Sequence, residues 1–365
     1  MNSTPGRLNS PVKREAAERY ILRSLVSFAL SVIITRTYLQ LTGYPQIGNA
    51  TLHIAHVLWG GLILFIAALL PLILANRWAL TVSAILSGVG IGLFIDEVGK
   101  FITQNNNYFF PPAAPIIYAF FLLTVLLYLN VRKPASQNPR ALMYRVLEDL
   151  TEVIDRDLNP DERARIEARL EEIHGATDDP NLHDLADSLE RFIDNKQLVV
   201  VHPKPGFFER LWQSVFPVVS KVATRQRLKA FLILALGIIG VLAMLDFARM
   251  MVAVPSASSA VERLLTAQVL HGQLRSAQEA LWFVIRVLLE GLTGIMLIFS
   301  GGMIAMGRER SGTQIGTLSL IIWISMINLL VYYFDQFGAV VLTVLQFIVL
   351  ASLLYYRRAY LKTAV

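Results

Sequence analysis

The amino-acid sequence predicts an all-α, polytopic membrane protein: eight transmembrane helices arranged as two parallel four-helix repeats, with a small helical cytoplasmic insert between them. Three observations support this prediction. Of the 365 residues, 55% are hydrophobic and only 16% are charged, whereas soluble domains carry about 25% charged residues. The apolar residues gather in uninterrupted runs that are long enough to cross a bilayer. Similar polar positions also recur in the two halves of the chain.

Residues 1–20 form a basic tail without a short apolar core or a small-residue cleavage site, so we expect no cleaved signal peptide. Residues 21–133 form the first membrane repeat, with spans predicted at about 21–41, 52–74, 80–101 and 114–131. Arg36 lies in the last turns of the first span, from where its side chain can reach the membrane interface by snorkelling. The second and third spans form a hairpin around the short turn Asn76–Arg77, so their open ends meet at one membrane face.

Small residues lie along the third predicted span, at Gly88, Gly90 and Gly92. No strand precedes them and the stretch is embedded in an apolar run, so they do not indicate a dinucleotide-binding loop. Small residues allow helix backbones to approach each other in a membrane. We therefore expect these glycines to serve close helix packing.

Residues 134–226 form the predicted cytoplasmic insert, where charges are dense and apolar residues recur at intervals of three and four. Asn159–Glu162 has the pattern of a helix start: an N-cap, a proline and an acid that reaches back. We expect three amphipathic helices to pack into a bundle over residues 138–195 that folds without the membrane parts. The histidines are scattered along the insert: His174, His183 and His202. They indicate no catalytic group. Binding of a cytoplasmic protein partner through residues 138–195, or a regulatory role, is the default.

Residues 227–365 form the second membrane repeat, with spans predicted at about 228–252, 280–306, 318–337 and 339–356. Basic residues flank the spans on one side: in the tail, in the insert, and around residues 308–310 and 357–362. Because cytoplasmic loops are rich in Lys and Arg, this predicts a multi-pass protein of the plasma (inner) membrane with both termini in the cytoplasm. The net charge of +6 follows from these flanks, so we expect a lipid bilayer, and no nucleic acid, as partner.

The two halves resemble each other around their polar positions. The segment His56–Leu62 aligns with Arg286–Leu292, and Phe94–Gly99 aligns with Tyr333–Gly338. A longer turn around residues 308–317 is expected to absorb the difference in spacing. Four crossings return the chain to its starting side, so the repeats are predicted to be parallel, related by an axis along the membrane normal. The alternative is chance similarity among leucine-rich segments.

Ionisable residues at membrane depth are costly, and they are functional candidates by default. Those of the first half are His53, His56, Asp96, Glu97 and Lys100, and those of the second are Arg286, Glu290 and Asp335. Asp96 and Lys100 are four residues apart and are expected to pair, as are Arg286 and Glu290. We expect both groups near the outer leaflet.

Two interpretations of the histidine hairpin remain open. One is a divalent metal site of zinc type, with the ligands His53, His56, Asp96 and Glu97. The ammonium of Lys100 opposes it, because a cation repels the metal. The other interpretation is a hydrogen-bonded cluster that ties the second span to the third.

Three functions from different classes fit these residues. The first is ligand or ion handling, as a transporter or sensor, at an outward-facing polar site; we favour it because duplicated bundles with a site at the repeat interface are typical of transporters. The second is a metal-dependent or acid–base membrane enzyme that acts on lipid or envelope precursors. The third is a scaffold that binds a cytoplasmic partner. We expect the first half to carry the function, because Arg286, which matches His56, cannot release its proton.

A histidine that opens a span, glycines one turn later and an acidic end to the next span occur at His56, Gly60, Gly61, Asp96 and Glu97. In these features the hairpin resembles VanZ-like and YjdF-like bacterial membrane proteins. The resemblance covers the hairpin alone, and the doubled architecture and the insert depart from that small-protein pattern. It implies a bacterial protein of the cell envelope.

Overall fold

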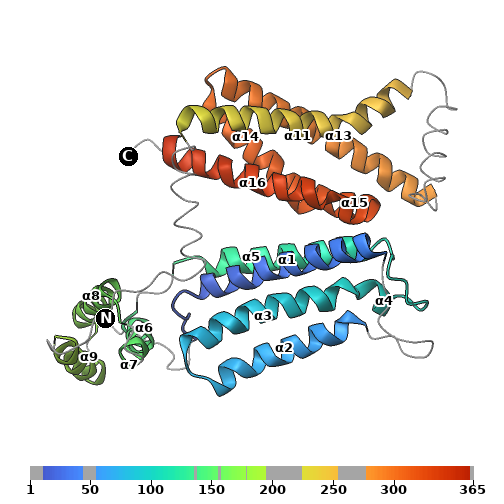
Figure 1. The fold of residues 1–365 in the computed structure, drawn as a ribbon. Helices are drawn as coiled ribbons and strands as arrows, with labels where there is room; N and C mark the ends of the chain where they lie inside the picture. Colours follow the sequence, from blue (N-terminus) through green and yellow to red (C-terminus); the bar gives the residue numbers. More distant parts are fainter. Residues whose placement is uncertain are drawn as a thin grey trace. The chain divides into compact units, whose positions relative to one another are not determined.

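The computed structural model describes seven stretches of the chain: residues 11–43, 55–134, 138–154, 158–177, 179–194, 224–253 and 277–361. The regular secondary structure of these stretches is helical, with no strand among them (Figure 1). The all-α class predicted from the sequence is thus confirmed for the described residues. The chain divides into two compact units, the first comprising Met1–Ser31, Leu58–Gly92 and Thr124–Leu211, and the second Val32–Val57, Leu93–Leu123 and Trp212–Val365.

Seven helical segments of the described chain have the length and apolar composition needed to cross a membrane. They are α1 (Ala17–Thr42), α2 (His56–Ile73), α3 (Arg77–Asp96), α5 (Ala113–Val131), α11 (Arg225–Ala253), α13 (Ala277–Ala305) and a run from Glu309 to Leu361. These segments agree with the predicted multi-pass membrane protein.

The run from Glu309 to Leu361 is a helical hairpin. Its elements are α14 (Glu309–Ile322), the π-helical turn η2 (Trp323–Ile327), α15 (Asn328–Asp335), the 3₁₀ turn η3 (Gln336–Ala339), α16 (Val340–Tyr356) and the π-helical turn η4 (Arg357–Leu361). The helix ends where Gln336 adopts a φ of 47° and a ψ of −127°. Beyond this point α16 packs back against α14, and the Tyr356 hydroxyl donates a hydrogen bond of 2.9 Å to Glu309.

Two element boundaries differ from the sequence-based predictions. The turn expected around residues 308–317 is wrong, because α14 already begins there, shortly after Gly307 with its φ of 85°. The third span was predicted to continue to Phe101, but α3 ends at Asp96 and a separate short helix, α4 (Val98–Ile102), follows. The second difference matters for function, since it places a chain break among the candidate site residues.

Glycines of α3 bring helices of the first unit into close contact. A Cβ atom at Gly88 would lie 2.2 Å from the backbone oxygen of Ser24 in α1. One at Gly90 would lie 2.9 Å from the backbone oxygen of Gly60 in α2. The predicted packing role of these small residues is therefore confirmed.

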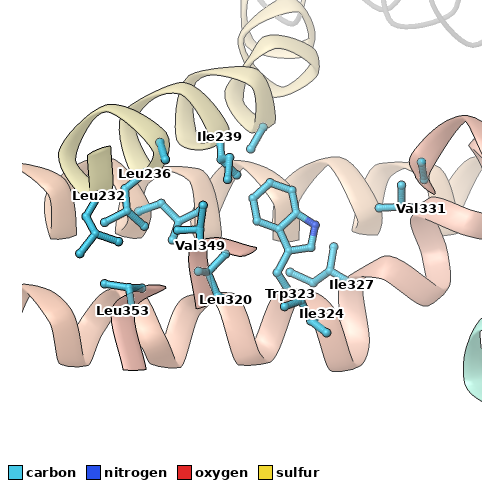
Figure 2. Close-up of a cluster of buried hydrophobic side chains, with 14 of the residues drawn as sticks. Leu232, Leu236, Ile239, Leu320, Trp323, Ile324, Ile327, Val331, Val349 and Leu353 are labelled. Carbon is cyan, nitrogen blue, oxygen red and sulfur yellow. The ribbon is translucent and has the colours of Figure 1, made fainter. Parts of the chain in front are cut away.

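A large apolar core lies in the second unit and joins α11, α14, η2 and α16 (Figure 2). Its fully buried side chains include Leu232, Leu236, Ile239, Leu320, Val349 and Leu353. A polar group lies within it: the Asn328 amide donates to the Gln346 side chain at 2.8 Å and to the Tyr118 hydroxyl at 3.2 Å. The Tyr118 ring of α5 stacks on Tyr332 with centroids 4.5 Å apart. The part of α5 around Tyr118 therefore packs into this core.

The insert contains α6 (Pro139–Asp149), α7 (Thr151–Ile154), α8 (Pro160–Ala176) and α9 (Pro180–Ile193). The helices α6, α8 and α9 share an apolar core, whose fully buried side chains are Val146, Leu158, Ile166, Leu170, Ile173, Ala186 and Ile193. The predicted N-terminal cap is present, since the Asn159 side chain accepts from the Glu162 N–H at 2.9 Å and the Glu162 carboxylate accepts from the Asn159 N–H at 3.0 Å. These three helices thus pack together as predicted.

Arg77, at the start of α3, ties the insert to the membrane hairpin within the first unit. Its guanidinium lies 2.7 Å from the Asp149 carboxylate and 2.8 Å from that of Glu152. Asp149 also accepts from Arg169 at 2.6 Å and is only 1% exposed. The turn between α2 and α3 is therefore held against the end of α6.

Candidate functional site

The break after α3 creates the polar cluster. Glu97, between α3 and α4, has a φ of −91° and a ψ of 10°. A Cβ atom at Gly99 would lie 2.8 Å from the backbone oxygen of Asn107, so the loop after α4 lies directly on this short helix. The Thr103 hydroxyl fastens the loop, because it donates to the Gly99 oxygen and accepts from the Asn107 N–H, both at 2.7 Å. This fold-back carries Tyr108 toward the end of α3.

Asp96 is the most enclosed member of the cluster, with an exposed fraction of 0%. One carboxylate oxygen accepts a hydrogen bond from Arg36 Nε. The other lies 3.0 Å from His56 Nε2 and accepts from the Tyr108 hydroxyl at 2.7 Å. Side chains from α1, α2 and the loop after α4 thus contact both oxygens.

Arg36 is buried, with an exposed fraction of 8%. Besides Asp96, its guanidinium lies 4.1 Å from the ring centroids of both Tyr108 and Phe337. The Arg36 side chain is therefore enclosed by protein groups and does not extend away from them, as the sequence suggested that it could. The carboxylate pairs its charge, and the two aromatic faces cover it.

Glu97 forms the second half of the cluster and is 1% exposed. Its Oε1 accepts from Lys100 at 2.7 Å and lies 3.2 Å from His56 Nδ1. Its Oε2 is buried without a hydrogen-bond partner among the described residues. The predicted pairing of Asp96 with Lys100 is wrong. Because the helix breaks at Glu97, Asp96 and Lys100 no longer lie on one helix, and Lys100 pairs with Glu97.

His56 connects the two carboxylates, since Nε2 faces Asp96 and Nδ1 faces Glu97. A neutral imidazole donates through only one nitrogen and offers a lone pair at the other. If both carboxylates are ionised, one contact is favourable and the other sets a lone pair against an anion. One additional proton, held by His56 or by a carboxyl group, removes this conflict. The geometry therefore provides a place for a proton that is shared by three side chains.

The second-half candidates form a separate ion-pair group. Arg286 lies 3.3 Å from Glu290, which confirms the predicted pair, and it also donates to Asp335. Arg286 and Glu290 are both 6% exposed, whereas the Asp335 side chain is 35% exposed. A guanidinium between two acids keeps its proton, so this group is a fixed ion pair.

Protein donors oppose the metal interpretation of the hairpin. Arg36 and the Tyr108 hydroxyl donate to the two oxygens of Asp96. The Lys100 ammonium lies 2.7 Å from Glu97 Oε1, where a cation repels a metal. His53, the fourth proposed ligand, lies outside the described residues.

Sequence reasoning missed Arg36 and Tyr108 as members of the cluster. Arg36 is an ionisable residue inside an apolar run, which by itself marks a functional candidate. Tyr108 has no such signal, because it follows an asparagine run in a loop and reaches Asp96 only through the fold-back over Gly99.

Comparison of the chain with protein-family models, curated proteins and solved structures gives no match.

Proposed function

We propose that the protein handles protons, in transport or in sensing, at an outward-facing polar site built from Arg36, His56, Asp96, Glu97 and Tyr108. The observation that supports the proposal best is the position of His56 between two buried carboxylates, at 3.0 Å and 3.2 Å. Histidine is the side chain whose charge changes most readily near neutral pH, so it suits reversible proton uptake.

The charges around His56 determine how one added proton changes the net charge of the cluster. Arg36 and Lys100 neutralise Asp96 and Glu97, so the cluster has no net charge while His56 is neutral. One proton then gives it a single positive charge. Because the buried oxygen Glu97 Oε2 has no partner among the described residues, it is the natural acceptor for a proton or for a donor group of a ligand.

Acid–base catalysis is a second candidate that the same oxygen supports. A buried carboxylate oxygen without a donor, next to a histidine, can serve as a general base once a substrate is bound. A proton-handling site takes up a proton without any substrate, whereas a catalytic base takes up a proton from a bound substrate. The two candidates therefore differ in whether the purified protein alone takes up the proton.

The test is ¹⁵N NMR of protein labelled at its histidine nitrogens, with the His56 signals assigned by their loss in His56→Ala. We expect acidification of the purified, substrate-free protein to convert these signals from those of a neutral ring to those of a doubly protonated ring. Glu97→Gln should alter this conversion, because the carboxylate next to His56 Nδ1 has been replaced by a neutral amide. His183→Ala, in the insert, is the control and should leave the conversion unchanged. His56 signals that do not respond to acidification would overturn the proposal.

Reconstitution into vesicles then separates transport from sensing. A potential is imposed with valinomycin and potassium, and proton entry is followed with a trapped pH-sensitive dye. Proton flux above that of protein-free vesicles, lost in His56→Ala, indicates transport. Protonation of His56 without flux indicates sensing.

We also propose that the chain crosses the membrane eight times, with both termini in the cytoplasm of a bacterial cell and the polar site at the outer face. The proposal rests on the placement of Lys and Arg and on the two arms of the Glu309–Leu361 hairpin. The chain has no cysteine. A single cysteine introduced at residue 140 or at residue 265 therefore shows, by its labelling, on which side of the membrane that residue lies. Labelling of residue 140 from outside, or protection of residue 265, would contradict this topology.

The parallel repeat remains part of this proposal. It is supported by matched contacts: His56 lies on Asp96 in the first half, and Arg286 lies on Asp335 in the second, each acid closing a helix. The second and third helices are also in contact in both halves: α3 contacts α2, and α14 contacts α13.

A further inference from the structure

The insert carries a second polar cluster, between the end of α8 and one face of α9. His174 lies in the last turn of α8, and His183 and Asp187 lie four residues apart on α9. Each of the three offers a ligand atom, and these atoms all lie within 4.8 Å of one another. The prediction that the histidines of the insert are scattered is therefore wrong for His174 and His183, which the helical hairpin brings together.

We propose that His174, His183 and Asp187 form a binding site for a divalent first-row transition metal, with zinc as the favoured ion. Imidazole nitrogen and carboxylate oxygen are common zinc ligands, and two histidines with one acid is a recurrent ligand set. Water can complete a tetrahedral site, because His183 and Asp187 are exposed to solvent.

The distances are close to those of a loaded site. In a tetrahedral site, two ligand atoms that each lie about 2.1 Å from the zinc ion are about 3.4 Å apart. The ligand atoms of the group lie within 4.8 Å of one another, so side-chain rotations must bring the farthest of them closer by up to about 1.4 Å. The 2.6 Å contact between His174 Nε2 and Asp187 Oδ1 must open instead, since the metal takes the place of the proton that these two atoms share.

The scaffold under the group is rigid, which limits the cost of assembling it. Ile173, next to His174, and Ala186, next to Asp187, are both 0% exposed in the core shared by α6, α8 and α9. The start of α9 is capped by Asp179, whose side chain accepts from the Asn181 N–H at 3.0 Å. The backbone positions of the ligands are thus set before any metal arrives.

Glu190 supplies a supporting carboxylate. Its Oε2 lies 3.9 Å from Nδ1 of His174, on the opposite side of the ring from Asp187. Metal-bound histidines commonly donate their second ring N–H to a carboxylate, which fixes the tautomer and orients the ring. A movement of about 1 Å would bring Glu190 to hydrogen-bond distance of His174. Glu190 is therefore a positioning residue and not a ligand.

The experiment is equilibrium dialysis of the full-length, detergent-purified and chelator-treated protein against zinc, with cobalt as a spectroscopic probe of tetrahedral geometry. We expect one zinc per chain at this site. His183→Ala and the nearly isosteric Asp187→Asn should each weaken binding at least about tenfold and abolish the tetrahedral cobalt absorption. Glu190→Gln should weaken binding by about tenfold while the absorption persists.

Two matched controls keep the result specific. His202→Ala removes another histidine of the insert, and His56→Ala removes the histidine between Asp96 and Glu97. Both variants should bind zinc as the wild type does. Zinc should also raise the melting temperature of the wild type but not that of Asp187→Asn. The proposal is overturned if the wild type binds no zinc, if His183→Ala and Asp187→Asn bind it unchanged, or if His56→Ala abolishes binding. Circular dichroism of each variant verifies that loss of binding is not loss of folding.

Discussion

Arg36 of α1 and Asp96 at the end of α3 form a two-point contact in the polar cluster around Asp96 and Glu97. Arg36 donates to the Asp96 side chain, and its Nη2 donates to the Asp96 backbone oxygen at 2.9 Å. The second contact satisfies a carbonyl at the C-terminus of a helix, where backbone oxygens lack an internal partner. The pair therefore both neutralises a buried charge and closes a helix end.

Removal of one partner of this pair is expected to be strongly destabilising. Arg36→Met leaves the Asp96 carboxylate buried without its cation, which should lower the free energy of unfolding by about 3–5 kcal/mol. In Arg36→Met/Asp96→Leu part of this loss should be recovered, because no unpaired charge remains. Denaturant unfolding in detergent micelles measures both. Arg23→Met, on the same helix, removes an exposed hydrogen bond to Thr81 and should change stability by less than about 1.5 kcal/mol. Equal effects of Arg23→Met and Arg36→Met would contradict the assignment.

The contact between α1 and α3 depends on the absence of a side chain at Gly88. An added methyl group would lie 2.2 Å from the Ser24 backbone oxygen, so Gly88→Ala must push the helices apart and should cost about 1–3 kcal/mol. Gly61→Ala is the matched control, because nothing lies within 4 Å of its Cβ position. There the higher helix propensity of alanine should leave stability unchanged or raise it by up to about 1 kcal/mol. Thermal unfolding compares the two; an equal loss in both would argue against close packing at Gly88.

The reversal before α16 contains a strained residue. A φ of 47° with a ψ of −127° at Gln336 suits glycine far better than a residue with a Cβ atom. Gln336→Gly should therefore stabilise the protein by about 1 kcal/mol in thermal unfolding. Ala339→Gly is the control in the same turn, and since its φ is an ordinary −73°, it should destabilise by up to about 1 kcal/mol. A loss of stability in Gln336→Gly would show that the contacts of the Gln336 side chain stabilise the protein by more than the backbone strain destabilises it.

The insert is expected to loosen from the membrane hairpin when Arg77 is replaced. Arg77→Gln removes one of the two arginines that contact the buried Asp149. Because a hydrogen bond to a charged group contributes about 1.5–3 kcal/mol, hydrogen exchange at the end of α6 should accelerate by at least about tenfold. Arg163→Gln breaks an exposed pair with Glu167 within α8 and should change exchange there by less than about threefold. Unchanged exchange in Arg77→Gln would indicate that other contacts hold the insert in place.

The amino-acid sequence by itself determined the helices. Length and apolar continuity mark the membrane-spanning segments, the three-and-four spacing marks the helices of the insert, and the Asn159 cap marks where α8 begins. These are properties of neighbouring residues, so they can be read without knowledge of the rest of the chain. The sequence also identified the polar residues at the ends of α2 and α3, because ionisable groups in apolar runs stand out at once.

Only the tertiary structure decided which of these groups meet. Arg36 and Asp96 are 60 residues apart, and the rotation of α1 about its axis determines whether the guanidinium turns inward or toward the lipid. A single break at Glu97 redirected Lys100 to a different acid, and the α8–α9 hairpin brought His174 to His183. Such pairings depend on the rotation of each helix and on its position along its neighbours. Packings that differ by only a few ångströms in these respects have the same periodicity in the sequence. Local pattern therefore specifies the elements of this protein, while packing between helices selects the partners that make its polar sites.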